Sequence, residues 1–136
     1  MGMYTELHLN VKLKRETPQD VINILKYMVH DKKALLDISD ILPKHELFIK
    51  ETRWNFMLVC DSYYFPADTH STIRFDDIGD RYYLCVRCNF KNYEDEISKF
   101  IDWITPYVEP DYTSFSGFYR YEENDNPTLI YIPKRD

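Results

Sequence analysis

The residues with the clearest chemical potential are two cysteines with the spacing of a redox dithiol, in the stretch "YYLCVRCNF" at 82–90. These residues alternate in character and predict a strand, in which Cys85 and Cys88 point to opposite faces. Sulfurs that diverge in this way cannot share a disulfide or a metal ion. A redox Cys-x-x-Cys usually begins a helix, and a zinc-binding pair usually lies in a turn. The pattern therefore predicts a structural strand, with Cys88 in the core and Cys85 on the opposite face.

A metal site could also arise from the loop after the first cysteine, if that loop folded back on itself. A single cysteine pair cannot complete a four-ligand zinc site. Acidic residues gathered in turns are usually solvated, and we favour that interpretation here. The candidate ligands in the loop are Cys60, Asp61, Asp68 and His70. We predict no metal site and no cofactor.

The composition argues against several classes of function. The formal net charge of -6 argues against broad nucleic-acid binding, which depends on Lys and Arg neutralising phosphates. The chain has only 3 glycines, so it can form neither a Walker loop nor a Gly-x-Gly-x-x-Gly turn. No stretch approaches the ~20 apolar residues of a membrane span, and the N-terminus lacks the apolar core of a signal peptide. We expect a cytoplasmic location.

Hydrophobic periodicity and capping residues predict one α+β domain over residues 1–136. Helices are expected at 18–29 with Thr17 as N-cap, at 32–42, and from an Asn92 cap to about 108, with Pro106 bending or ending the last. Strands are expected at 5–13, 54–60, 71–77, 81–90, 114–123 and 128–133. This order favours a two-layer sandwich of the ferredoxin-like, or split βαβ, type, with an additional short helix and additional strands.

In such a fold the helices cover one face of the sheet and leave the other open. Tyr and Arg, which are enriched at interface hot spots, are among the residues expected there. The alternative is an ordinary solvated sheet face. The predicted partner-binding residues are Glu6, His8, Asn10, Tyr83, Cys85, Arg87, Phe118 and Arg120; Tyr4, Lys12, Asn89 and Ser116 are expected on the same face.

Three functions are compatible with this face. The leading hypothesis is a non-enzymatic protein that binds a protein partner, which could be a second copy of the chain. The second is a small ligand-binding domain or hydrolase that uses Glu6, His8 and Cys85, because the first strand and the hairpin strand are expected to be neighbours. The third is single-stranded nucleic-acid binding, in which bases stack on Tyr and Phe, although the acidic balance argues against it.

Both ends of the chain resemble a group of known proteins. The stretches "MYTELHLNVKLKRETPQDVINILKYM" and "GFYRYEENDNPTLIYIP" are similar to small uncharacterised proteins of phages and prophages of low-GC Gram-positive bacteria. The resemblance implies an accessory protein, and counter-defence or host takeover is a common task of such proteins, which usually act by binding. It provides no functional residue.

Overall fold

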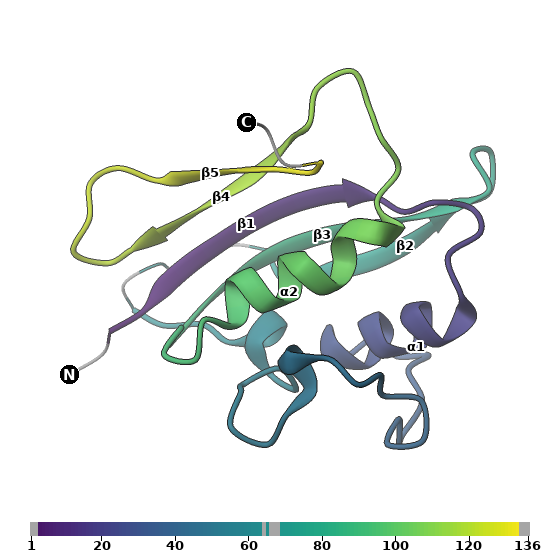
Figure 1. Cartoon of the computed structure of the whole chain (residues 1–136), viewed down its shortest axis with the longest axis horizontal. Coiled ribbons are helices and arrows are strands. Elements are labelled where there is room, and N and C mark those ends of the chain that lie inside the picture. Colours follow the sequence, from purple (N-terminus) through teal and green to yellow (C-terminus); the bar gives the residue numbers. More distant parts are fainter. Residues whose placement is uncertain (1–2, 64, 66–68, 134–136) are drawn as a thin grey trace.

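Strand β1 (Thr5–Lys12) lies at the centre of an antiparallel sheet in a computed structural model that describes residues 3–63, 65 and 69–133. The sheet forms one layer of an α+β sandwich, and the helices form the other layer (Figure 1). The remaining elements are α1 (Gln19–Met28), η1 (Glu46–Phe48), η2 (Met57–Val59), β2 (Thr72–Asp76), β3 (Arg81–Phe90), α2 (Glu96–Ile104), η3 (Thr105–Tyr107), β4 (Phe115–Tyr121) and β5 (Thr128–Tyr131).

The strand order is β2-β3-β1-β4-β5, and every neighbouring pair is antiparallel. Alternate residues of β1 and β3 point into the core, as their sequence pattern predicts. Leu7, Leu9, Leu84 and Val86 are almost completely buried between the sheet and the helices. The predicted two-layer α+β architecture is therefore confirmed, and both helices leave the other face of the sheet open (Figure 1). We call this surface the open face.

The predicted helix at 32–42 is wrong. In the structure this segment is made of turns and bends. The Asp31 carboxylate accepts a hydrogen bond from the Lys33 amide at 2.8 Å, and the Asp37 carboxylate accepts one from the Ser39 amide at 2.9 Å. Aspartate side chains that bond nearby amides in this way stabilise turns at the expense of helix.

The predicted strand at 54–60 is also wrong. The segment forms turns and the short helix η2, which places Met57 and Leu58 in the core against β3. A short apolar run satisfies either a buried strand or a buried turn, and its pattern alone does not distinguish them. The chain then runs alongside β3, because the Asn89 amide donates to the Cys60 carbonyl at 3.1 Å.

The predicted helix boundaries need smaller corrections. Thr17 does not cap α1, since its hydroxyl donates to the Lys14 carbonyl at 2.6 Å. Helix α2 begins at Glu96, later than an Asn92 cap implies, yet the Asn92 carboxamide oxygen does accept a bond from the Ile97 amide at 3.0 Å. Pro106 lies in η3, directly after the end of α2, as its lack of an amide proton predicts.

Candidate partner-binding face

The strand register places the eight predicted site residues on the open face. Four cross-strand pairs between β1 and its neighbours contain seven of them. The eighth, Arg87, lies opposite His8 on the side of β3. The four pairs are Glu6 with Arg120, His8 with Phe118, Asn10 with Cys85, and Lys12 with Tyr83. The alternation within β1, β3 and the second half of β4 thus predicted the orientation of these side chains correctly.

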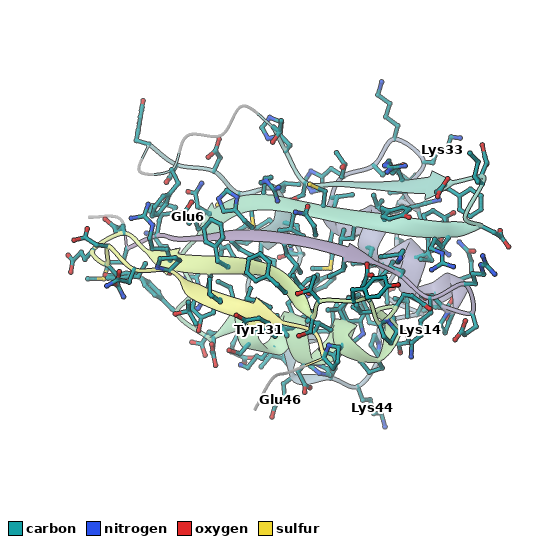
Figure 2. The ribbon with its side chains drawn as sticks, turned by 90° about the horizontal axis from the view of Figure 1, so that it is seen from above. Glu6, Lys14, Lys33, Lys44, Glu46 and Tyr131 are labelled. Carbon is teal, nitrogen blue, oxygen red and sulfur yellow. The ribbon has the colours of Figure 1, made fainter. Side chains whose placement is uncertain are left out.

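A charged cluster occupies the start of β1 on this face, close to the position labelled Glu6 in Figure 2. One carboxylate oxygen of Glu6 accepts a bond from Nε of Arg120 at 2.8 Å, and the other lies 2.8 Å from Nε2 of His8. The Glu6 side chain is 11% exposed, whereas the side chains of His8 and Arg120 are each 32% exposed. The carboxylate therefore has two side-chain partners that both reach solvent.

His8 has a second contact that fixes its ring. The imidazole stacks on the Phe118 ring with a centroid distance of 4.6 Å and an interplanar angle of 14°. The two residues are direct cross-strand partners in the β1–β4 register, so the backbone pairing places their rings side by side. His8 thus joins the charged cluster to the aromatic side chains of β4.

Two residues that follow Cys60, Asp61 and Phe65, cover one end of the open face. Asn89 points toward this face but is only 1% exposed, because its carboxamide nitrogen donates to the Asp61 carboxylate and to the Phe65 carbonyl, each at 3.0 Å. The Arg120 guanidinium lies over the Phe65 ring, 5.0 Å from the centroid of that ring. Asn89 therefore lies on the predicted face but is covered by other residues, and Arg120 is partly covered as well.

The opposite side of the face, over β4 and β5, is apolar. Phe115 and Leu129 are 48% and 49% exposed. Leu129 lies opposite Phe118 in the β4–β5 register, and Phe115 lies opposite Tyr131. The ring centroids of Phe115 and Tyr131 are 5.9 Å apart. Figure 2, which looks onto the sheet with the helices behind it, labels Tyr131 on β5. We call His8, Phe115, Phe118, Leu129 and Tyr131 the β4–β5 patch.

A β-bulge creates this patch. The register shifts between Phe115 and Gly117, so that Ser116 is an extra residue in β4. Residues three apart in a regular strand point to opposite faces, which would put Phe115 and Phe118 on different sides. The extra residue brings both onto the open face. The bulged residue, Ser116, is itself buried and donates to the Ser114 carbonyl at 3.0 Å.

The far end of the open face is polar and slightly concave. The Arg74 guanidinium lies over the Tyr83 ring at 4.8 Å, and the Lys12 ammonium lies 3.7 Å from the Asp111 carboxylate. A depression of about 450 Å³ is lined by these four residues together with Asn10 and Cys85. It is therefore separate from the β4–β5 patch.

The structure does not bring Cys85 and His8 into a bonded pair. Cys85 lies opposite Asn10, whereas the partners of His8 are Glu6 and Phe118. All three cysteines are free thiols. Burial raises the pKa of Cys88 far above its ordinary value, and burial also raises the pKa of Cys60. Neither of these two thiols is activated as a nucleophile, since the thiolate is the reactive form.

Within the described ranges, the His, Cys, Asp and Glu residues form no group of three that could hold a metal ion. Asp68, one of the candidate ligands, lies outside the described residues. Among the helices that the structure describes, none is long and apolar enough to cross a membrane. Comparison of the chain with protein-family models, curated proteins and solved structures found no match.

Sequence reasoning missed three residues of the β4–β5 patch. The alternation of "TLIYI" predicts that Leu129 and Tyr131 share one face while Ile130 and Ile132 share the other, and both isoleucines are indeed buried. This signal was present but was not connected to the open face, since the position of β5 in the sheet was unknown. Phe115 had no such signal, because its orientation depends on the bulge.

Proposed function

We propose that this protein binds a protein partner through the open face of its sheet, and that the β4–β5 patch is the centre of the interface. The observation that carries this proposal is the continuous row of His8, Phe118 and Leu129 across three strands, with Phe115 and Tyr131 beside it. Exposed aromatic and aliphatic groups bordered by an arginine have the composition of an interface core with a polar rim.

Binding is better supported than hydrolysis by the arrangement of the same residues. His8 is stacked and bonded to a carboxylate, and the nearest thiol on the face lies opposite a different residue of β1. Single-stranded nucleic acid is less supported too, because Arg120 is already paired with Glu6 and covered by Phe65. Phosphate contacts need cations that are free to approach the backbone of the nucleic acid.

We further propose that the fold is a ferredoxin-like sandwich with one added strand. The order β4-β1-β3-β2, with a helix after β1 and another after β3, corresponds to the split βαβ arrangement, and β5 extends it by a hairpin. A cytoplasmic accessory role in a phage or prophage, such as counter-defence, is the biological setting that we propose on the resemblance of the chain ends.

A second copy of the chain is the partner to test first. Size-exclusion chromatography with light scattering over a wide range of protein concentration measures self-association, and immobilised protein then measures capture of host proteins. The decisive variant is Phe115→Thr with Leu129→Thr, because both side chains are about half exposed and threonine is compatible with strands. The matched control is Ile78→Thr with Tyr112→Thr, two fully exposed apolar residues outside the patch.

We expect the patch variant to weaken association about tenfold or more, as loss of a hot-spot residue does, and the control to leave it unchanged. The variants Arg87→Glu and Tyr83→Ala test the rest of the face and should have smaller effects. If the wild-type chain neither self-associates nor retains any host protein, or if the patch variant retains everything that the wild type does, the proposal is wrong.

A further inference from the structure

A second surface, independent of the open face, lies at the edge of the sheet beside α1. A groove of about 560 Å³ runs between β2 and the C-terminal end of α1 with the turn that follows it. Strand β2 pairs only with β3 among the described residues, so its other side is an edge. Alternate residues of an edge strand direct their amide and carbonyl groups away from the sheet, where another strand can pair with them.

The base of the groove is apolar. Ile73 is buried, but Phe75, on the same side of β2, remains 44% exposed. The Phe75 ring contacts the Tyr82 ring edge-on with centroids 5.0 Å apart. Because part of the Phe75 ring remains in solvent, a segment lying along β2 would remove apolar surface from water.

The wall of the groove is basic. It is lined by Lys26, Lys32 and Lys33, and Figure 2 shows Lys33 outside the β2 edge. The Lys26 ammonium lies 5.3 Å from the centroid of the Tyr82 ring. Within the described ranges, none of these lysines forms an ion pair. The lining contains one acidic residue, Asp31, and one of its carboxylate oxygens accepts a hydrogen bond from the Lys33 amide.

Native proteins protect edge strands against pairing in several ways, one of which is a charged side chain on the edge. The central charge of β2, Arg74, does not extend across the edge, because its guanidinium lies over the Tyr83 ring on the open face. Among the described residues, the edge of β2 therefore opens onto the groove, next to three lysines that form no ion pair there, although the Lys26 ammonium also lies over the Tyr82 ring. In a chain with a net charge of -6, this is a local reversal of sign.

We propose that the β2 edge binds an extended acidic peptide segment, which adds to the sheet as a further strand. Main-chain hydrogen bonds to β2 supply affinity, as in other cases of strand addition. Apolar side chains of the segment cover Phe75 and Tyr82, and its carboxylates lie near Lys32 and Lys33. Charge complementarity selects an acidic segment over a basic one.

The test measures binding of a fluorescent, end-blocked peptide of Val, Thr and Glu, about eight residues long, by anisotropy at low salt. We compare it with the same peptide carrying Lys in place of Glu and with one carrying N-methylated amides. The protein variant is Lys32→Glu with Lys33→Glu. The matched control is Lys44→Glu with Lys50→Glu, which makes the same charge change at exposed positions elsewhere; Lys44 lies on the opposite side in Figure 2.

We expect the acidic peptide to bind, the Lys peptide and the N-methylated peptide not to bind, and the groove variant to bind about tenfold more weakly. The control variant should change affinity less than about twofold, by long-range charge alone. Amide exchange in β2 should slow when the peptide is bound. Failure of the acidic peptide to bind, equal binding of the N-methylated peptide, or equal losses in the two protein variants would overturn the proposal.

Discussion

Two arginine–glutamate pairs in this protein are built in opposite ways. On the open face, Glu6 accepts bonds from two side chains, those of Arg120 and His8. In the helix layer, Glu96 is completely buried and accepts bonds from two backbone amides, of Arg53 at 2.8 Å and of Glu94 at 3.1 Å. The Arg53 guanidinium is a weaker partner of Glu96, at 3.5 Å.

The difference lies in what each carboxylate holds in place. Glu96 connects the start of α2 to the turn before η2, two segments far apart in the sequence, and its partners are backbone groups that the fold positions. Glu6 instead orients His8 and Arg120, whose side chains are each 32% exposed. We infer that the pair of Glu96 and Arg53 stabilises the fold, whereas the pair of Glu6 and Arg120 shapes a surface.

The largest expected effect comes from removing the buried carboxylate. Glu96→Ala leaves two part-buried backbone amides and the Arg53 guanidinium without their acceptor, so we expect a loss of about 3–5 kcal/mol in the free energy of unfolding. Urea denaturation followed by circular dichroism measures it. Glu94→Ala is the control: the Glu94 side chain is exposed, and its removal should cost no more than about 0.5 kcal/mol. Equal losses would contradict the structural role of Glu96.

The next largest effect on stability is expected at Gly117, where the backbone of β4 pairs with that of β1 beneath the open face. A Cβ atom at Gly117 would lie 1.8 Å from the His8 carbonyl oxygen, and the backbone there has φ of 158°. Gly117→Ala must therefore push β4 away from β1, and we expect it to cost about 2–4 kcal/mol. Because this pairing aligns His8 with Phe118, the variant should also weaken the partner binding that we propose for the β4–β5 patch.

Gly79 provides the control for that substitution. It lies in the turn between β2 and β3, where the nearest contact of an added Cβ is the Asp76 carboxylate, a side-chain group that can move. Gly79→Ala should cost less than about 1 kcal/mol in urea denaturation. A cost for Gly79→Ala as large as that for Gly117→Ala would contradict the close approach of β1 and β4.

A smaller effect is expected from the charge on Glu6. Glu6→Gln keeps an acceptor for Arg120 but removes the ionic attraction to a guanidinium whose side chain is 32% exposed, so we expect a loss of about 1 kcal/mol. The control is Asp111→Asn, whose partner Lys12 lies 3.7 Å away and whose side chain is 58% exposed; it should cause almost no loss. If Glu6→Gln were as costly as Glu96→Ala, the proposed difference between the pairs would not hold.

The parts of the fold that the sequence predicted are those with a strong period. The alternation in β1 and β3 predicted the orientation of Glu6, His8 and Cys85 correctly, because a strand that is buried on one face allows only one register. The errors fall where local bonds compete with periodicity. Asp31 and Asp37 stabilise turns in place of the predicted helix, and the apolar run at 54–60 satisfies its burial as η2.

The candidate site was predictable only in part for a related reason. Cross-strand neighbours follow from the strand order, which a single sequence does not provide. The contact of His8 with Phe118 and the burial of Asn89 against Asp61 and Phe65 both depend on segments distant in sequence. The orientation of the Phe115 side chain depends on one inserted residue in β4, which turns Phe115 onto the open face.

The smallest expected effect on stability compares Cys85, on the open face, with Cys88, in the core. Cys85→Ser should change the free energy of unfolding by less than about 0.5 kcal/mol, because the side chain is partly exposed. Alkylation at about pH 8, mapped by mass spectrometry, should label Cys85 first and Cys88 only on unfolding, since burial raises the pKa of Cys88 and excludes the reagent.

The raised pKa of Cys88 also fixes how the free energy of unfolding depends on pH. The folded protein holds the Cys88 proton more tightly than the unfolded chain, so this contribution to stability is complete below pH 9.0, the ordinary thiol value, and is lost as pH rises past it. Cys88→Ala should reduce the alkaline loss of stability. Labelling of Cys88 in the native protein as fast as Cys85 would mean that the two faces of β3 are not divided as the structure describes.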